Sequence, residues 1–310
     1  MQVVLASALA QNPPTDPALR PLLAEGEGWQ VVADNLQFCD GPNADAHGNF
    51  YFSEMRSTPP VIWCVSPQGQ KTKLIEGTIA SASKFGPDGR LYACASKEKL
   101  LVVFELPGGK RTVLATEVQP NDLVVSHRGH IYFTETGKKQ VTFLDPHSGE
   151  KKGADVGITA PNGIALSPDQ QTLAVSDSKG TNVWTFRIEK NGSLSAKTAP
   201  MVMRTPIDTN ATPTAATVYK TASGGDGMTA DTQGRYYVSS WLGVQVFAPS
   251  GEFLGILANP GTKNMTSAGF AGPNLEYLYV TCGYTVFRRK MSARGFLYYQ
   301  APLASVTEKK

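Results

Sequence analysis

The chain has 310 residues, of which 41% are hydrophobic and 18% charged, enough apolar content to bury a core and to exclude extensive disorder. The formal net charge is only +3 and both signs are interspersed, so no electrostatic pattern for binding nucleic acid is present. No stretch approaches the roughly 20 apolar residues that a membrane-spanning helix requires. We therefore expect a globular protein, without nucleic acid or membrane as partner.

The first segment, residues 1–27, is expected to be a leader. Its apolar run ends in Ala8-Leu-Ala10, which resembles the end of a secretory signal, although the basic residues that normally precede such a run are missing. This pattern favours a periplasmic or secreted protein over a cytoplasmic one, with a flexible leader as the alternative. Prolines between residues 13 and 21 prevent a long helix there.

A repeat organises the chain from residue 28 to residue 310. Each copy has a short polar residue, a short apolar stretch, a turn rich in Gly, Pro, Asp or Asn, and then an apolar strand. Equivalent positions of that strand recur 40–42 residues apart, with one longer step of 63, at Tyr51, Tyr92, Tyr132, Ala174, Tyr237 and Tyr279. The longer step contains a polar insertion around residues 190–220, which we expect to be a surface loop.

A period of about 40–45 residues with four strands per repeat is typical of propeller blades. Further strands are expected at residues 61–65, 101–104, 141–144, 183–186 and 244–247. We therefore predict an all-β fold, a six-bladed β-propeller with its site at one mouth of the central channel. The strand near residues 29–32 is predicted to complete the last blade and close the ring, which would cover an exposed edge. A β-sandwich or a two-domain chain would not explain six near-equal repeats.

The residue that opens the first strand of each blade should lie near one mouth of the channel, so six blades would form a ring. Aligned on the turns, this ring contains six short polar residues: Asp40, Ser81, Asn121, Asn162, Asp226 and Ser267. Carboxylate and amide oxygens suit a hard divalent cation such as calcium, and two carboxylates would nearly neutralise its charge. The alternative is that these residues hold structural waters and cap strand starts.

Four short motifs carry a resemblance to a known family: Asp40-Gly-Pro42, Pro120-Asn-Asp122, Pro161-Asn-Gly163 and Gly225-Asp-Gly227. In this order, and over about residues 30–290, the sequence resembles the SMP-30/gluconolactonase/luciferin-regenerating-enzyme family of six-bladed propellers. The resemblance implies one divalent cation, usually calcium, with zinc, magnesium or manganese as alternatives. The resemblance also implies that Asp40, Asn162 and Asp226 bind this cation. Asn121 corresponds to a family residue that contacts substrate or a metal-bound water.

Three positions depart from the family pattern. Asp40 stands where the family normally has Glu, which is one methylene longer. Gln119 stands where some members have a substrate-binding Arg, and the Lys138-Lys139 region stands where those members have a Glu. The resemblance therefore implies that the metal ligands are retained and that the substrate contacts, Gln119 among them, are changed.

We expect a metal-dependent hydrolase that opens a lactone, either a sugar-type aldonolactone or a related cyclic ester. The cation would act as a Lewis acid, Asp226 is the candidate general base, and Asn121 would orient water or substrate. No Gly-x-Ser-x-Gly or His-Glu-x-x-His sequence supports a serine hydrolase or a zincin. The alternatives are a non-catalytic propeller that binds a ligand or protein with a structural calcium, or a hydrolase of other esters or phosphotriesters.

A few other residues are expected to be structural. Trp241 is interpreted as packing between blades, with a substrate platform at the mouth as the alternative. Three acids that end equivalent strands are expected to cap turns: Glu54, Glu135 and Asp177. Four cysteines have no metal-ligand spacing and are expected to be small buried hydrophobes, with a disulfide as an open alternative: Cys39, Cys64, Cys94 and Cys282.

Overall fold

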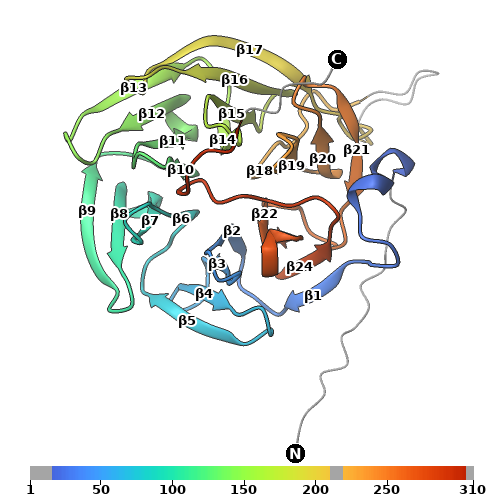
Figure 1. Ribbon diagram of the computed structural model, residues 1–310, viewed down its shortest axis with the longest axis horizontal. Coiled ribbons are helices and arrows are strands. Elements are labelled where there is room, and N and C mark those ends of the chain that lie inside the picture. The colour runs from blue at the N-terminus through green and yellow to red at the C-terminus, as the bar shows by residue number, and fades with distance from the viewer. Residues whose placement is uncertain (1–15, 210–218, 305–310) are drawn as a thin grey trace, which may run out of the picture.

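The apolar repeats form six four-stranded antiparallel sheets arranged in a ring around a central channel (Figure 1). This computed structural model describes residues 16–209 and 219–304. In each sheet the strands are ordered so that sequence neighbours pair, with a single exception in the blade that closes the ring. The prediction of an all-β, six-bladed propeller is confirmed.

The strands have the following bounds. Blade 1 contains β2 (Cys39–Ala44), β3 (Phe50–Glu54), β4 (Val61–Val65) and β5 (Lys71–Glu76). Blade 2 contains β6 (Ser83–Phe85), β7 (Leu91–Ala95), β8 (Leu100–Glu105) and β9 (Lys110–Thr116). Blade 3 contains β10 (Leu123–Val125), β11 (Ile131–Glu135), β12 (Gln140–Leu144) and β13 (Lys151–Val156).

The second half of the ring repeats this plan. Blade 4 contains β14 (Pro161–Leu166), β15 (Thr172–Asp177), β16 (Asn182–Ile188) and β17 (Leu194–Val202). Blade 5 contains β18 (Met228–Ala230), β19 (Tyr236–Ser240), β20 (Gly243–Phe247) and β21 (Phe253–Ala258). Blade 6 contains β22 (Ser267–Ala271), β23 (Tyr277–Cys282), β24 (Thr285–Lys290) and β1 (Gln30–Ala33).

Helical structure among the described residues is limited to short 3₁₀ turns: η1 (Pro17–Leu22), η2 (Ser96–Glu98), η3 (Thr136–Lys138) and η4 (Pro273–Leu275). Within residues 16–209 and 219–304, no helix has the length and apolar character needed to cross a bilayer.

The recurring tyrosine of the second strand has a structural cause. In three blades its hydroxyl donates to an aspartate of the preceding turn, at 2.7 Å in Tyr51–Asp45 and at 2.8 Å in both Tyr92–Asp88 and Tyr237–Asp231. Each of these aspartates also accepts backbone N–H groups of its own turn. The tyrosine therefore fixes the turn to the strand that follows it, which explains why the repeat is visible in the sequence.

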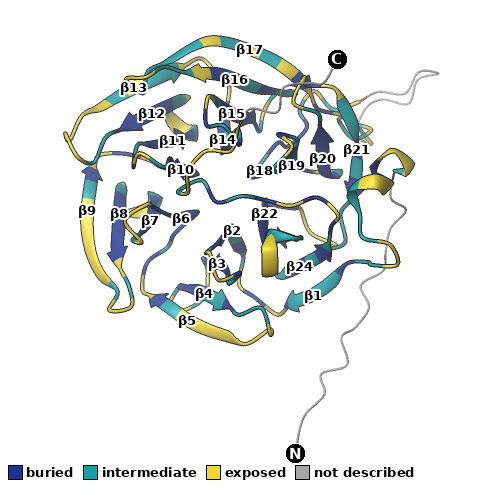
Figure 2. Cartoon of the chain, viewed as in Figure 1, coloured by how far each residue is buried: buried dark blue, intermediate teal, exposed yellow. Residues whose placement is uncertain are grey.

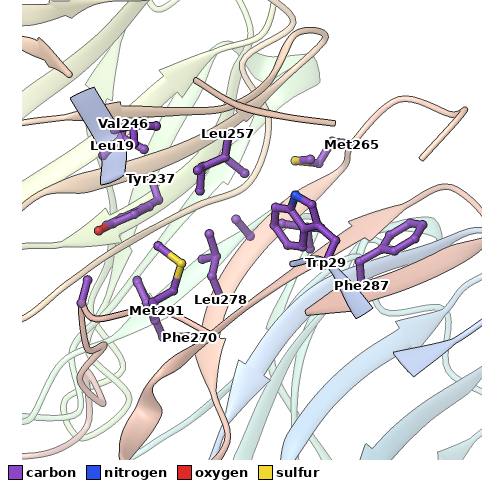
Figure 3. Close-up of a cluster of buried hydrophobic side chains, with 14 of the residues drawn as sticks. Leu19, Trp29, Tyr237, Val246, Leu257, Met265, Phe270, Leu278, Phe287 and Met291 are labelled. Carbon is purple, nitrogen blue, oxygen red and sulfur yellow. The ribbon is translucent and has the colours of Figure 1, made fainter. Parts of the chain in front are cut away.

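The hydrophobic core lies between neighbouring blades. Six clusters of buried side chains occur among the described residues, one at each junction. The cluster between blades 5 and 6 contains Tyr237, Leu257 and Leu278, together with Trp29 from the segment before β1 (Figure 3). The inner strands are mostly buried, whereas most residues of outer strands such as β5 and β9 are exposed to solvent (Figure 2).

The first strand closes the ring, as the sequence predicted. β1 pairs antiparallel with β24, so it forms the outer strand of blade 6. The sequence also places residues 16–27 in the leader, but Leu19 of η1 is fully buried against blades 5 and 6. The packed part of the chain therefore extends back at least to η1, and residues 1–15 of the expected leader lie outside the described residues.

The expected surface loop is partly a strand, and the cysteines form no disulfide among the described residues. Part of the insertion around residues 190–220 forms β17, the outer strand of blade 4, while residues 210–218 lie outside the described residues.

All four cysteines are free thiols, and three of them are buried: Cys39, Cys94 and Cys282. They act as small apolar residues at the blade junctions.

A segment after the last strand, residues 291–303, crosses one end of the channel, and we call it the strap (Figure 1). The amide of Thr232 in blade 5 donates to Arg294 O at 2.8 Å, and the Gln170 side chain in blade 4 donates to Tyr298 O at 2.7 Å. Four strap side chains line the cavity at this end of the inner strands: Phe296, Leu297, Tyr298 and Tyr299. The strap therefore closes this end of the channel with apolar and aromatic groups.

Candidate functional site

The ring predicted at the channel mouth is present at the other end of the inner strands. The amides of Asn121 and Asp226 donate to carbonyls of the second strand of their own blades, at 2.8 Å to Thr134 O and 2.9 Å to Ser239 O. These bonds fix each ring residue just before its inner strand. The same bond from Ser81 reaches Cys94 O at 3.1 Å, so the predicted positions in these blades are equivalent.

In blade 6 the ring residue is Thr266, and the predicted Ser267 is wrong by one position. The amide of Thr266 makes the equivalent bond, to Thr281 O at 2.8 Å, whereas Ser267 pairs with Thr281 one step farther in. The cause is the longer hairpin around η4, because Gly269 pairs with a residue ten positions later while Thr229 in blade 5 pairs with one eight positions later. An alignment of the repeats on their turns therefore assigns the ring position of blade 6 one residue too late, at Ser267 instead of Thr266.

The residue after each candidate ligand is glycine, because the strands converge in the channel. A Cβ on Gly163 would collide with the carbonyl oxygen of Asp226, and one on Gly227 would collide with the Ser267 hydroxyl. Gly41 has a left-handed φ of +64°, and its Cβ would lie 2.8 Å from the Cα of Ala82. The three Gly positions allow the blades that carry the carboxylates and the amide to approach each other closely.

Hydroxyl groups of one blade hold the backbone of the next at the mouth. Thr134 Oγ1 in blade 3 donates to Asn162 O in blade 4 at 2.6 Å. Ser176 Oγ in blade 4 donates to Asp226 O in blade 5 at 2.9 Å. Two of the predicted site residues are thus fixed by their neighbours as well as by their own strands.

Asp40 and Asp226 are brought together with Asn162, and all three are partly exposed at the mouth. Burial raises the pKa of Asp40 to about 7, and the nearby Asp122 adds to this effect against hydrogen bonds from Gly41 and Thr266. Burial and the charge of Asp40 raise the pKa of Asp226 well above its usual range, although Gly227 and Asn162 donate hydrogen bonds to it. The two carboxylates therefore repel each other in a poorly solvated place.

A second layer of charge lies beneath the ring and was missed by the sequence reasoning. Asp122 is buried, and burial raises the pKa of its carboxyl despite the nearby Lys84. Burial lowers the pKa of Lys84, whose ammonium donates to Pro42 O at 2.6 Å. The sequence did contain a signal for this charge. Lys84 occupies an inner-strand position at which the neighbouring blade has the apolar Val124.

The mouth offers oxygen donors for a cation rather than a compact cluster of acids. Within the described ranges, no group of three or more His, Cys, Asp or Glu side chains is placed to hold a metal ion. An ion at the mouth would therefore bind the carboxylates of Asp40 and Asp226, the amide oxygen of Asn162, and water. This all-oxygen set suits calcium or another hard cation, and a divalent ion would relieve the repulsion between the carboxylates.

The strand-end acids have the structural role that the sequence predicted. Glu54 accepts hydrogen bonds from the amide of Gln37 and from the indole of Trp63, both at 2.8 Å. Asp177 similarly accepts the amide of Ala160 at 2.9 Å. In each case the carboxylate fixes the loop that leads into the inner strand of its own blade.

Gln119 and Lys138, two of the positions that depart from the family pattern, both contact Glu135, the acid that ends β11. The amide of Gln119 donates to Glu135 Oε1 at 2.8 Å, and Lys138 Nζ lies 2.8 Å from that same oxygen. The Gln119 side chain is exposed and lies against Gly137. Lys138 is thus paired with Glu135, and Gln119 is not part of the lining of the pocket that contains Asp226.

A pocket of about 340 Å³ opens beside Asp226, over blades 5, 6 and 1. Its lining includes Phe38, Arg56, Trp241, Lys263 and Tyr284. Trp241 is 38% exposed, so its interpretation as a packing residue between blades is wrong. Its indole lies against Gly224, where a side chain would collide with the ring, and this places it at the wall of the mouth.

The fold and the site together define a class: a six-bladed propeller with an acidic, oxygen-lined mouth that opens into a small-molecule pocket. Residues 38–284 match the family described as the SMP-30/gluconolactonase/LRE-like region, and the chain belongs to this family. The match covers most of the ring, from the residue before β2 to the turn before β24.

Two curated relatives are lactonases by name. A gluconolactonase of Zymomonas mobilis is 27% identical over 316 residues, which cover 90% of this chain and 85% of the relative. A pentonolactonase of Haloferax volcanii is 24% identical over 217 residues, covering 67% of this chain and 68% of the relative.

Solved structures share the fold. A gluconolactonase from Xanthomonas campestris aligns with a TM-score of 0.77 and 21% identity, covering 92% of this chain and 97% of the other. A calcium-binding protein, regucalcin, from Agrobacterium tumefaciens aligns with a TM-score of 0.70 and 17% identity, covering 88% and 97%. At these identities the likeness establishes the architecture of the ring.

Proposed function

We propose that this protein is a hydrolase that opens a lactone at the channel mouth with the help of a bound divalent cation. The observation that carries the proposal is the pair of poorly solvated carboxylates, Asp40 and Asp226, of which Asp226 lines a pocket of about 340 Å³. The family and its two lactonase relatives support lactones as the substrate class.

The charges of the channel support a divalent ion. Asp40 and Asp122 lie near one cationic side chain, Lys84, and Asp226 lies near both of these acids, so three ionised carboxylates with one ammonium would carry two uncompensated negative charges. Asp40, Asn162 and Asp226 would hold the ion, and calcium fits their oxygen donors best. When bound, the cation would polarise the lactone carbonyl and stabilise negative charge on its oxygen.

The residues of the chain would supply the proton transfer and the orientation. Asp226 would accept a proton from water as the water oxygen bonds to the carbonyl carbon. The bond between that carbon and the ring oxygen then breaks, and the ring oxygen leaves with the proton, giving the hydroxy acid. Asn121, the neighbour of Asn162 on the ring, would orient the water or the lactone with its amide.

The experiment is proton release from aldonolactones and simpler lactones, corrected for spontaneous hydrolysis. Chelator-treated protein is compared with the same protein supplied with calcium, magnesium, manganese or zinc. We expect at least one cation to restore turnover and Asp226→Ala to reduce kcat by about a hundredfold or more, as expected for loss of a general base. The matched control is Glu252→Gln, an exposed turn residue far from the pocket lining.

The alternatives give different results. Calcium-dependent thermal stabilisation without turnover of any lactone would indicate a binding propeller with a structural ion. Turnover of aryl esters or phosphotriesters, with no turnover of lactones, would indicate that the same site hydrolyses another class of ester. Unchanged lactone turnover in Asp226→Ala would remove Asp226 from the chemistry.

A further inference from the structure

The pocket beside Asp226 is surrounded by cations that lie on aromatic rings. The guanidinium carbon of Arg56 is 4.5 Å from the centre of the Phe38 ring, and Lys263 Nζ is 5.7 Å from that of Tyr284. Both pairs line the pocket. Farther out, Lys220 Nζ lies 5.0 Å from the Trp241 ring, which forms another wall.

These cations have no acidic partners in the described part of the chain. Among residues 16–209 and 219–304, no carboxylate lies within salt-bridge distance of Arg56, Lys220 or Lys263, and Asp226 is the one acid in the pocket lining. The rings hold the charged ends in place without neutralising them. The rim of the pocket is therefore positive while its floor is acidic.

The backbone is shaped to place these pairs. Phe38 has a φ of +63°, which is strained for a bulky residue, and it lies two residues before Asp40. The amide of Arg56 donates to Gln37 O at 2.8 Å, which holds Arg56 beside the Phe38 loop. On the other side, Gly283 has a φ of +62°, and a Cβ there would lie 2.8 Å from the Cβ of Lys263.

We propose that the natural lactone carries an anionic group, a carboxylate or a phosphate, which Arg56 and Lys263 bind while the ring carbonyl faces Asp226. The inference rests on the proposed function and names its substrate class. A guanidinium binds either anion through paired hydrogen bonds, and a lysine adds a point charge. A neutral aldonolactone would leave both cations without a partner, and its turnover would gain nothing from them.

The test compares three substrates under one set of conditions: glucono-1,5-lactone, glucaro-1,4-lactone and 6-phosphoglucono-1,5-lactone. We expect kcat/KM to be about tenfold or more higher for at least one of the anionic lactones, and the two anionic arms identify which group is preferred. Arg56→Gln and Lys263→Gln should each reduce this value by about tenfold to a hundredfold, the loss expected for charge-assisted hydrogen bonds. Turnover of the neutral lactone should change less than twofold.

The control is Lys110→Gln, which removes an exposed positive charge on the outer strand β9. It should leave all three substrates unaffected. Raising the salt concentration should weaken the preference for the anionic lactone and leave the neutral one unchanged, because exposed charges are screened.

A second readout separates this inference from the proposed function. Calorimetry measures the binding of glucarate and 6-phosphogluconate to the unmodified protein and to the two variants. Binding that Arg56→Gln and Lys263→Gln both weaken supports the anion site even if no lactone is turned over, in which case the proposed hydrolase alone fails. Equal kcat/KM for neutral and anionic lactones, with wild-type values in both variants, overturns the anion site and leaves the hydrolase standing.

Discussion

The two ends of the channel are formed by the same six inner strands, yet they have opposite chemistry. At one end the strands begin with oxygen-bearing side chains, and Asp226, whose charge is close to that of Asp40, lines a pocket. At the other end the strap covers the channel with groups such as Leu297 and Tyr299. Since the backbone plan is common to both ends, the difference comes from the side chains and from the segment that covers the strands.

This difference separates function from stability within one ring. Changes at the open mouth act on groups that we assign to binding and chemistry, whereas changes at the strap act on packing. The glycines beneath the mouth belong to both, because they set how closely the blades approach. Three substitutions test this division, beginning with the one expected to have the largest effect.

Gly163→Ala should have the largest effect, because the new Cβ would collide with the backbone of Asp226 in the next blade. Backbone cannot rotate away as a side chain can, so we expect the free energy of unfolding to fall by about 3 kcal/mol or more. Denaturant unfolding measures this loss. Gly108→Ala is the control, since a Cβ there meets no atom within 4 Å. A Gly163→Ala protein as stable as the wild type would contradict the close contact of blades 4 and 5.

Leu297→Ala tests the strap. Leu297 is 8% exposed and packs in the cluster between blades 6 and 1, so truncation should cost about 2–4 kcal/mol of unfolding free energy. The kcat for lactone opening should stay within about twofold of wild type, because the strap lies at the opposite end from Asp226. Leu303→Ala, at a position 40% exposed, should cost much less. A large fall in kcat for Leu297→Ala would show that the two ends are not independent.

Glu135→Gln should have the smallest effect, and it should depend on pH. Burial acts to raise the pKa of Glu135, but hydrogen bonds from Lys138, Thr142 and Gln119 outweigh it and hold the pKa below the usual value. A carboxyl whose pKa is lowered by folding stabilises the protein above its unfolded pKa of about 4.3 and loses that contribution as the pH falls further.

We therefore expect Glu135→Gln to cost about 1–2 kcal/mol at pH 7 and progressively less as the pH falls below about 4.3. Thermal or urea unfolding between pH 3 and pH 8 measures this. Because Glu135 holds the loop before Asn121, a small decrease in kcat/KM should accompany the loss of stability. Glu105→Gln, at an exposed pair 3.6 Å from Lys110, is the control and should change the unfolding free energy by less than about 1 kcal/mol. A loss of stability that does not change with pH would argue against the ionised hydrogen-bonded carboxylate.

The number of blades and the ring closure could be predicted because both have local causes in the sequence. The turn and the strand that follows it recur with the blades, with a tyrosine–aspartate pair in three of them. The residues next to Trp29 form a strand that belongs to none of the six repeats, which left it free to complete the last blade. Most of the ring at the mouth followed from the same alignment. Thr266 was missed because the hairpin around η4 is longer, and turn length cannot be read from the pattern of apolar residues.

Other features depend on how distant segments meet. The strap has no periodicity, so nothing in residues 291–303 indicates that it crosses the channel. The position of Lys84 beside Asp122 depends on the convergence of strands from different blades. Trp241 reaches the mouth because Gly224 leaves room for its indole, and these two residues lie in separate loops. The pairs of cation and ring at the pocket arise in the same way.

The pairing of β1 with β24 has a consequence for how the chain is made. Gln30 pairs with Arg288, which lies 258 residues later, so blade 6 cannot be completed until almost the whole chain has left the ribosome. Until then the earlier blades form an open arc whose two edge surfaces, apolar and unpaired, are exposed to other chains. The ring is therefore complete only when β24 is available to pair with β1.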